Sequence, residues 1–214
     1  MALTKVIGNG LGTLGDGTAN DTKIVFDGNA QDFHIGLDDS ADSLTIGLGS
    51  ALGTTSHMIF DANGHITKPK QSAFLVHKNN SAQENLAANV DVTITFGAEH
   101  FDVNSDFNTS NSTFTAPVTG KYFLSTAIRL GQLDTDANYH IITIFTSNRS
   151  YRVLLDSNNT FSGDSLYHSF TVATLADMDA GDTAKVEFNQ GSGSAIADAS
   201  GDPQFTFFSG YLVC

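Results

Sequence analysis

The sequence predicts an all-β protein in which an antiparallel sandwich or jelly roll follows a glycine-rich β-hairpin stem. Charged residues make up only 15% of the chain, and most polar residues are Thr, Asn, Ser and Asp, which suit strands and turns better than helices. Eleven of the 20 glycines lie within residues 1–68. After residue 69, strand-like apolar segments recur without a helical period. These three observations predict the fold class and its division into two parts.

The stem is predicted over residues 21–68, between a flexible anchor (residues 1–20) and a knob (residues 69–214). Short apolar segments alternate here with Asx and Gly turns, and Phe33–Leu37 and Leu44–Leu48 alternate as the two strands of a hairpin. Two or three such hairpins are marginally stable in water by themselves. We therefore expect copies of the same chain to cover the apolar faces of the stem.

The knob contains nine strand candidates, which predicts an antiparallel sandwich or jelly roll. They are Ser72–Lys78, Val92–Phe96, Ser112–Thr115, Lys121–Leu130, Tyr139–Thr146, Tyr151–Leu155, Leu166–Leu175, Ala184–Asn189 and Phe205–Val213. The last of these segments carries large apolar side chains on both faces. A strand that is apolar on both faces needs a second burial surface, so it predicts a subunit interface.

Three ordered motifs in the knob resemble the globular head of complement C1q. They are the run Phe101–Leu124, the Gly-Asp turn within Met178–Val186, and the terminal segment Phe208–Val213. The resemblance implies a ten-strand jelly roll of the tumour-necrosis-factor type, assembled as a tight homotrimer with its first and last strands near the axis. The chain has no Gly-X-Y repeat, so its stem differs from a collagen stalk.

The expected trimer contacts come from both parts of the chain. In the stem they are Phe26, Phe33, Ile35, Leu37 and Ile46, and in the knob they are Tyr122, Phe205, Phe207 and Tyr211.

Residues 26–42 resemble repeats in tail-fibre and other virion-surface proteins of marine bacteriophages. This resemblance implies a trimeric fibre or spike on the virion surface. Its N-terminus would contact other virion proteins, and its knob would bind a glycan or protein of the host surface. Two alternatives stay open: a capsid-attached fibre or decoration protein, and a depolymerase of host polysaccharide.

No catalytic motif is present, so we expect a protein without enzymatic activity. The seven histidines are scattered and interpreted as surface residues, and the one cysteine, Cys214, is the last residue. Paired Asp residues fall in predicted turns, where Asp is favoured because its side chain bonds its own backbone. We expect no bound cofactor or metal. The one alternative is a calcium site at Asp134–Asn138. Its two carboxylates and one amide are fewer than the six to eight oxygen ligands that calcium usually takes.

Three polar loops of the knob are predicted to form its ligand-binding end: residues 132–138, 158–163 and 190–202. The candidate ligand-binding residues are Asp134, Asp136, Asn138, Asn158 and Asn159.

The formal net charge of −13 argues against a nucleic-acid partner, because phosphate backbones would be repelled. No run approaches the roughly 20 apolar residues that a bilayer requires, so we expect no membrane insertion.

Overall fold

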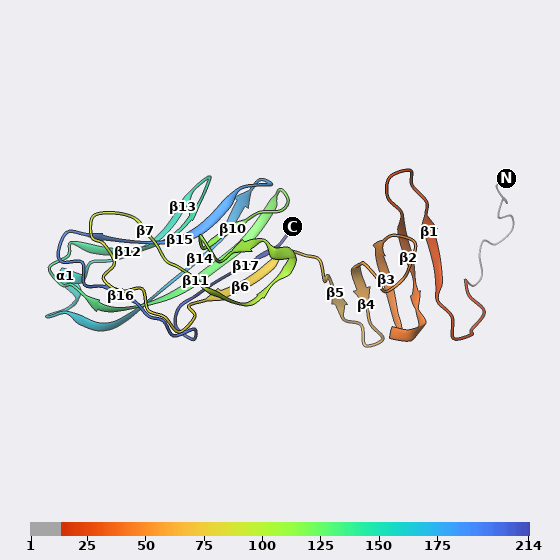
Figure 1. Ribbon diagram of the computed structural model, residues 1–214, viewed down its shortest axis with the longest axis horizontal. Helices are drawn as coiled ribbons and strands as arrows, with labels where there is room; N and C mark the ends of the chain where they lie inside the picture. The colour runs from red at the N-terminus through yellow and green to blue at the C-terminus, as the bar shows by residue number, and fades with distance from the viewer. Residues whose placement is uncertain (1–13) are drawn as a thin grey trace. The chain divides into compact units, whose positions relative to one another are not determined.

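The computed structural model describes residues 14–214 and divides into two compact units after Gln71 (Figure 1). We call residues 14–71 the stem and residues 72–214 the knob. Residues 1–13, the greater part of the predicted anchor, lie outside the described residues. No helix within residues 14–214 is long and apolar enough to cross a membrane.

The stem is one antiparallel sheet whose five strands follow one another in chain order. The strands are β1 (Thr22–Phe26), β2 (Phe33–Asp38), β3 (Ser43–Leu48), β4 (Ser56–Phe60) and β5 (Ile66–Thr67). A single 3₁₀ turn, η1 (Asp39–Ala41), joins β2 to β3. Asp38 Oδ1 accepts a hydrogen bond from the Ala41 N–H at 3.2 Å, and Asp42 takes a left-handed φ of 48°. Residues 38–42 form the hairpin turn, because the carboxylate of Asp38 caps the 3₁₀ turn.

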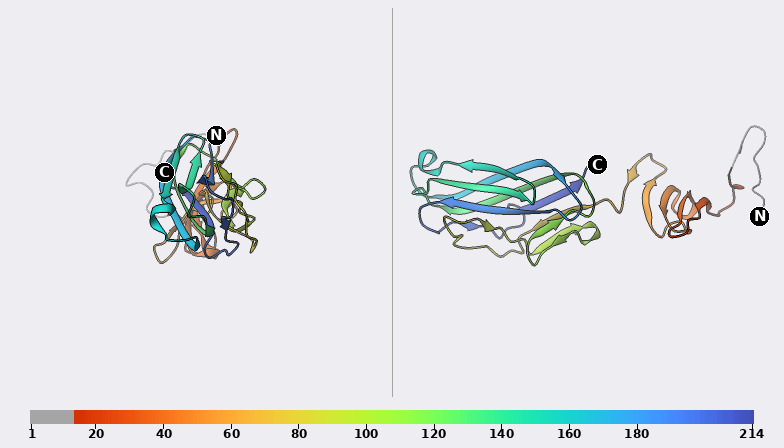
Figure 2. Two further views of the ribbon diagram at one scale, coloured as in Figure 1. Left: turned by 90° about the vertical axis from the view of Figure 1, so that its left-hand side faces the viewer. Right: turned by 90° about the horizontal axis from the view of Figure 1, so that it is seen from above.

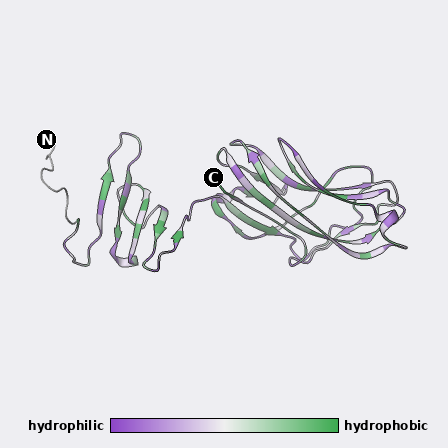
Figure 3. Cartoon of the chain, turned by 180° about the vertical axis from the view of Figure 1, so that it is seen from behind, coloured by the Kyte–Doolittle hydropathy of each residue, from purple (hydrophilic) through white to green (hydrophobic). Residues whose placement is uncertain are grey.

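The register of the stem sheet places its apolar side chains on one face. Ile24 pairs with Ile35, Ile35 with Ile46, and Ile46 with Met58, so four strands contribute to one apolar row. Figure 3 shows hydrophobic and hydrophilic residues alternating along these strands. Several side chains of this face are exposed, including Phe26 at 59% and Ile24 at 44%.

The opposite face of the stem sheet is polar and is covered by the loop of residues 49–55. His34 is 1% exposed, and its Nδ1–H donates to the Gly49 carbonyl at 2.9 Å. Gly47 permits this packing, because a Cβ there would lie 2.4 Å from the Thr55 carbonyl oxygen. The interpretation of His34 as a surface histidine is therefore wrong, since the loop that follows β3 buries its side chain.

The knob is a jelly-roll sandwich of two antiparallel sheets, seen from two directions in Figure 2. The first, which we call the inner sheet, has the order β14-β11-β17-β6-β8, with β16 beside β11. Its strands are β14 (Ser165–Met178), β11 (Gly120–Leu133), β17 (Phe207–Leu212), β6 (Ala73–His77), β8 (Ala98–Asp102) and β16 (Asp198–Ala199).

The second sheet, which we call the outer sheet, has the order β13-β12-β15-β10-β9, with β7 beside β15. Its strands are β13 (Ser150–Leu155), β12 (Tyr139–Thr146), β15 (Thr183–Gly191), β10 (Thr113–Thr115), β9 (Phe107–Asn108) and β7 (Val92–Thr93). The knob also contains the 3₁₀ turn η2 (Val103–Ser105) and the short helix α1 (Ser157–Thr160).

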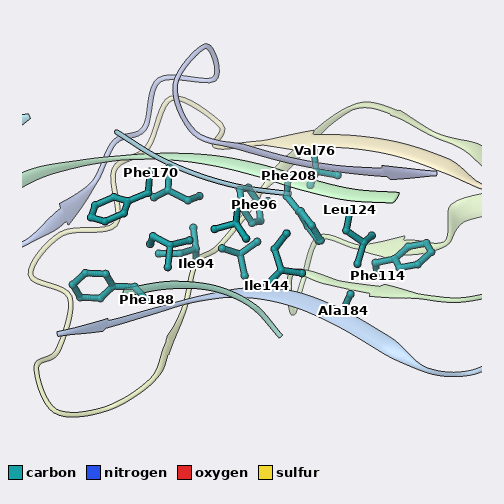
Figure 4. Close-up of a cluster of buried hydrophobic side chains, with 14 of the residues drawn as sticks. Val76, Ile94, Phe96, Phe114, Leu124, Ile144, Phe170, Ala184, Phe188 and Phe208 are labelled. Carbon is teal, nitrogen blue, oxygen red and sulfur yellow. The ribbon is translucent and has the colours of Figure 1, made fainter. Parts of the chain in front are cut away.

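Phenylalanines from both sheets fill the space between them (Figure 4). Phe74 and Phe208 of the inner sheet are 1% and 0% exposed, and their ring centroids lie 5.1 Å apart. Phe74 also stacks on Phe114 of the outer sheet at 4.7 Å. The knob therefore has a complete hydrophobic core within one chain.

All nine predicted strands of the knob overlap a strand in the structure, and β12 has the predicted bounds. β11 and β14 are longer than expected because they pair along nearly their whole lengths, from Gly120↔Met178 to Leu133↔Ser165. The sequence pattern missed β8, β9 and β16.

Candidate functional site

The three loops predicted to bind a ligand lie at one end of the knob. Figure 1 places this end, marked by α1, opposite the C-terminus of the same unit. The loops are tied together, since the Thr135 N–H and Oγ1 both donate to Asp164 Oδ1 at 2.9 Å. The Asn138 N–H donates to the Gly191 carbonyl at 2.7 Å. We call residues 132–138, 156–164 and 190–202 the apical loops.

Asp134 holds the apical loops together and does not face a ligand. It is 5% exposed, its Oδ1 accepts the Asp136 N–H at 2.8 Å, and its Oδ2 accepts the Ser194 N–H. Both carboxylate oxygens are thus engaged by backbone donors. The assignment of Asp134 to a ligand-binding surface is therefore wrong, because burial withdraws it from solvent.

The other four predicted ligand residues, Asp136, Asn138, Asn158 and Asn159, are exposed at this end. Asn159 is partly engaged, because its side-chain amide donates to Asp156 Oδ2 at 2.8 Å. Within residues 14–214, no three or more His, Cys, Asp or Glu side chains lie together in a way that could hold a metal ion.

A buried polar network, which the sequence did not reveal, supports the apical loops from below. His140 is 0% exposed and lies between Ser157 Oγ at 3.0 Å and Gln190 Oε1 at 3.2 Å. Gln190 in turn donates to the Ser192 and Ser194 carbonyls at 2.9 and 2.8 Å. Burial lowers the pKa of His140, so the neutral imidazole is favoured. His140 is therefore a structural residue under the loops, which corrects its interpretation as a surface histidine.

Two residues of the predicted Asp pairs, Asp177 and Asp182, have pKa values shifted away from that of a glycosidase acid. A hydrogen bond from Lys121 lowers the pKa of Asp177, and a hydrogen bond from the Asp179 backbone N–H lowers that of Asp182. A general acid needs the opposite shift, which burial would supply. Asp177 lies in β14 and Asp182 lies between β14 and β15, and both carboxylates favour the ionised form.

The outward face of the inner sheet exposes aromatic side chains. Phe123 and Tyr211 lie side by side across β11 and β17, with ring centroids 5.5 Å apart, and Tyr211 is 49% exposed. Phe207 is half-buried on the same strand. Phe205 is 41% exposed and lies 3.9 Å below the Arg129 guanidinium.

Tyr122 does not belong to this outward face. It is 0% exposed, packs against Phe114 with a centroid distance of 5.5 Å, and donates its hydroxyl to the Val118 carbonyl at 2.8 Å. Its assignment to a trimer interface is therefore wrong. Alternation along β11 sends Tyr122 into the core and its neighbour Phe123 outward.

Hollows open on both sheets of the knob. A hollow of about 370 Å³ lies at the apical end of the inner sheet, between Leu166 and Tyr167 on one side and Ser200 and Gly201 on the other. A smaller hollow of about 180 Å³ lies on the outer sheet. It is lined by Asp91, Tyr139, Ile141, Thr143, Arg152 and Asn189.

Comparison with known proteins places the match in the knob. Residues 73–213 match the family model of the C1q domain. No curated protein matches the chain. Among solved structures, the globular domain of zebrafish complement 1qA protein is 17% identical, with a TM-score of 0.48 over 67% of this chain and 98% of that chain. Murine APRIL is 14% identical, with a TM-score of 0.48 over 67% of this chain and 100% of that chain.

Proposed function

Because the chain belongs to the C1q domain family, we propose that it is a non-enzymatic, homotrimeric binding protein whose stem and knob both contribute to the trimer. Trimers are typical of this fold. The observation that carries the proposal is the apolar surface that each unit leaves open in a single chain. Monomeric soluble proteins rarely expose contiguous apolar patches beyond a few hundred Å².

The stem supplies the stronger argument for assembly. Its apolar face spans all five strands of the sheet, with the register setting these side chains side by side. The face comprises Ile24, Phe26, Phe33, Ile35, Leu37, Leu44, Ile46, Leu48, Met58, Phe60 and Ile66. A sheet with an apolar face has to bury that face against a second layer of structure. Three copies packed about a common axis would cover the face.

In the knob, the outward face of the inner sheet is the proposed contact surface. Around Phe123 and Tyr211 this face combines exposed aromatic rings with small residues such as Ser125, Ala127 and Ser209, which the register places in neighbouring positions. Aromatic side chains are enriched at the buried centre of protein interfaces. Of the predicted contacts, Phe207 and Tyr211 lie on this face.

We infer further that the protein is a fibre or spike of a bacteriophage particle, located on the virion surface. The support is the resemblance of residues 26–42 to repeats of phage tail-fibre and virion-surface proteins. On this proposal the N-terminal residues join other virion proteins, and the knob binds a glycan or protein on the host surface.

A truncation that begins at Lys70 tests this division of roles. The truncated chain is expected to trimerise and bind the bacterium that the particle infects, but to be absent from purified particles. Cryo-electron microscopy of the particle would then distinguish a tail position from a capsid position. Incorporation of the truncated chain into particles, with unchanged adsorption after loss of the knob, would contradict the proposal.

A further inference from the structure

We propose that the outer-sheet hollow is a saccharide-binding site that takes one acidic pyranose ring. The inference rests on the proposed function of the knob as a binding unit and names its ligand class. We call the hollow's six lining residues the outer-sheet site; they are Asp91, Tyr139, Ile141, Thr143, Arg152 and Asn189.

Strand pairing assembles the outer-sheet site from segments distant in sequence. Ile141 of β12 is paired with Asn189 of β15, and Thr143 of β12 is paired with Arg152 of β13. Directly paired side chains on one face lie about 4.5–5.5 Å apart at Cβ. Five of the six residues therefore lie on three neighbouring strands, which hold them more rigidly than a loop would, and Asp91 directly precedes β7.

An aromatic ring forms one wall of the outer-sheet site. Tyr139 is paired with Gly191, and a Cβ at Gly191 would lie 2.5 Å from the Tyr139 ring. The glycine thus lets the ring lie against the sheet and fixes its position. Tyr139 and Ile141 provide apolar surface for the C–H groups of a sugar ring, and the Tyr139 hydroxyl provides a polar edge.

Asp91 and Asn189 orient one another for hydrogen bonding to hydroxyl groups. Asn189 Nδ2 donates to Asp91 Oδ1 at 2.8 Å, and within residues 14–214 neither side chain has another hydrogen-bond partner. Asp91 Oδ2 and Asn189 Oδ1 are left as acceptors, and one Asn189 N–H is left as a donor. Adjacent sugar hydroxyls, each both donor and acceptor, match this set.

Arg152 gives the site its preference for an acidic ligand. Its side chain is exposed and forms no hydrogen bond or ion pair within the described part of the chain. The neighbouring carboxylate of Glu187 is already paired with Lys185 at 2.8 Å. A free guanidinium binds a carboxylate through two parallel hydrogen bonds. In a chain with a net charge of −13, an unpaired arginine beside hydroxyl-binding groups points to a carboxylated sugar.

The size and position of the hollow fit a single ring of a longer glycan. Its volume of about 180 Å³ is smaller than the ~300–1,000 Å³ of pockets that enclose drug-sized ligands. Its open side lets a polymer continue into solvent. The larger hollow beside Tyr167 lies on the sheet that we assign to subunit contact, whereas the outer-sheet site stays open in the proposed trimer.

Saturation-transfer NMR on the full chain tests the inference, with methyl β-glucuronide and methyl β-glucoside as probes. Saturation is expected to reach the ring protons of both sugars, with at least tenfold tighter binding of the glucuronide. Arg152→Gln should reduce glucuronide affinity at least tenfold and leave glucoside affinity unchanged. Asn189→Ala should lower the affinity for both sugars.

Arg149→Gln is the matched control, since Arg149 is an exposed arginine at the turn before β13 and outside the hollow. It should leave both affinities unchanged. Absence of saturation transfer to either sugar, or an equal response of the Arg152 and Arg149 variants, would overturn the inference. If the unmodified protein adsorbs to the host bacterium in that case, the proposed function stands and only the outer-sheet site is wrong. Failure of adsorption would instead count against the proposed function.

Discussion

Replacing Tyr211 by alanine should separate assembly of the knob from its folding. Tyr211 lies at the C-terminal end of β17, on the proposed contact face, and is 49% exposed in one chain. A tyrosine side chain buries about 150–250 Å² when fully covered, so roughly 80 Å² of apolar surface remains open. At about 25 cal/mol per Å², covering this surface contributes about 2 kcal/mol per copy and about 6 kcal/mol per trimer. The substitution should therefore raise the dissociation constant of the trimer roughly 10⁴-fold.

Leu154→Ala is the matched control for Tyr211→Ala. Leu154 is 58% exposed on β13 of the outer sheet and outside the proposed contact face. Both variants are made in the chain that begins at Lys70 and examined by sedimentation velocity from nanomolar to micromolar concentration. We expect dissociation of the Tyr211 variant at concentrations where the unmodified knob and the Leu154 variant stay associated. If the two variants dissociate alike, the inner-sheet face is not the subunit contact.

Three further predictions follow from named side chains. Ile24→Asp on the apolar face of β1 should dissociate the stem trimer and lower the melting temperature of the stem. Val25→Asp, on the other face of the same strand, should have neither effect. Crosslinking measures the association, and circular dichroism measures the melting temperature. Burial lowers the pKa of His140, so the unfolded chain takes up its proton first, and the free energy of unfolding should fall as pH drops below about 6.5, by at most ~1.4 kcal/mol per pH unit from this group. Denaturant titrations should show a shallower fall for His140→Gln, and an unchanged slope would contradict the assignment. Phe208→Ala should destabilise the knob by about 3–5 kcal/mol, because Phe208 is 0% exposed; a loss below 1 kcal/mol in the same titrations would refute the core packing.

The strands with clear alternation were predictable from sequence. Tyr139–Thr146 forms β12 with the expected bounds. The segment is rich in apolar and β-branched residues and shows no helical periodicity. Ala98–Asp102 forms β8 but lacks alternation, because both of its faces near the sheet edge are largely exposed. Such a strand forms because β6 pairs with it, and this pairing cannot be inferred from the sequence of residues 98–102 by itself.

The candidate site was predictable in position but not in detail. The apical loops gather at one end of the knob, as predicted from their polar sequences. A turn carboxylate such as Asp134, however, can face solvent or accept N–H groups from a distant loop. Its partner Ser194 lies 60 residues away. Alternation likewise defines two faces of β11 without indicating which face packs against the core, so the sequence does not distinguish Tyr122 from Phe123 as the outward residue. The outer-sheet site joins Asp91 to residues of three strands, and no local pattern marks it.

Light scattering of the full chain in solution tests the trimer most directly. We expect a single species of three times 22.7 kDa at micromolar concentration, unchanged on further dilution into the nanomolar range. A monodisperse species of 22.7 kDa under the same conditions would contradict it, because both the stem face and the inner-sheet face would then be exposed to water without a partner.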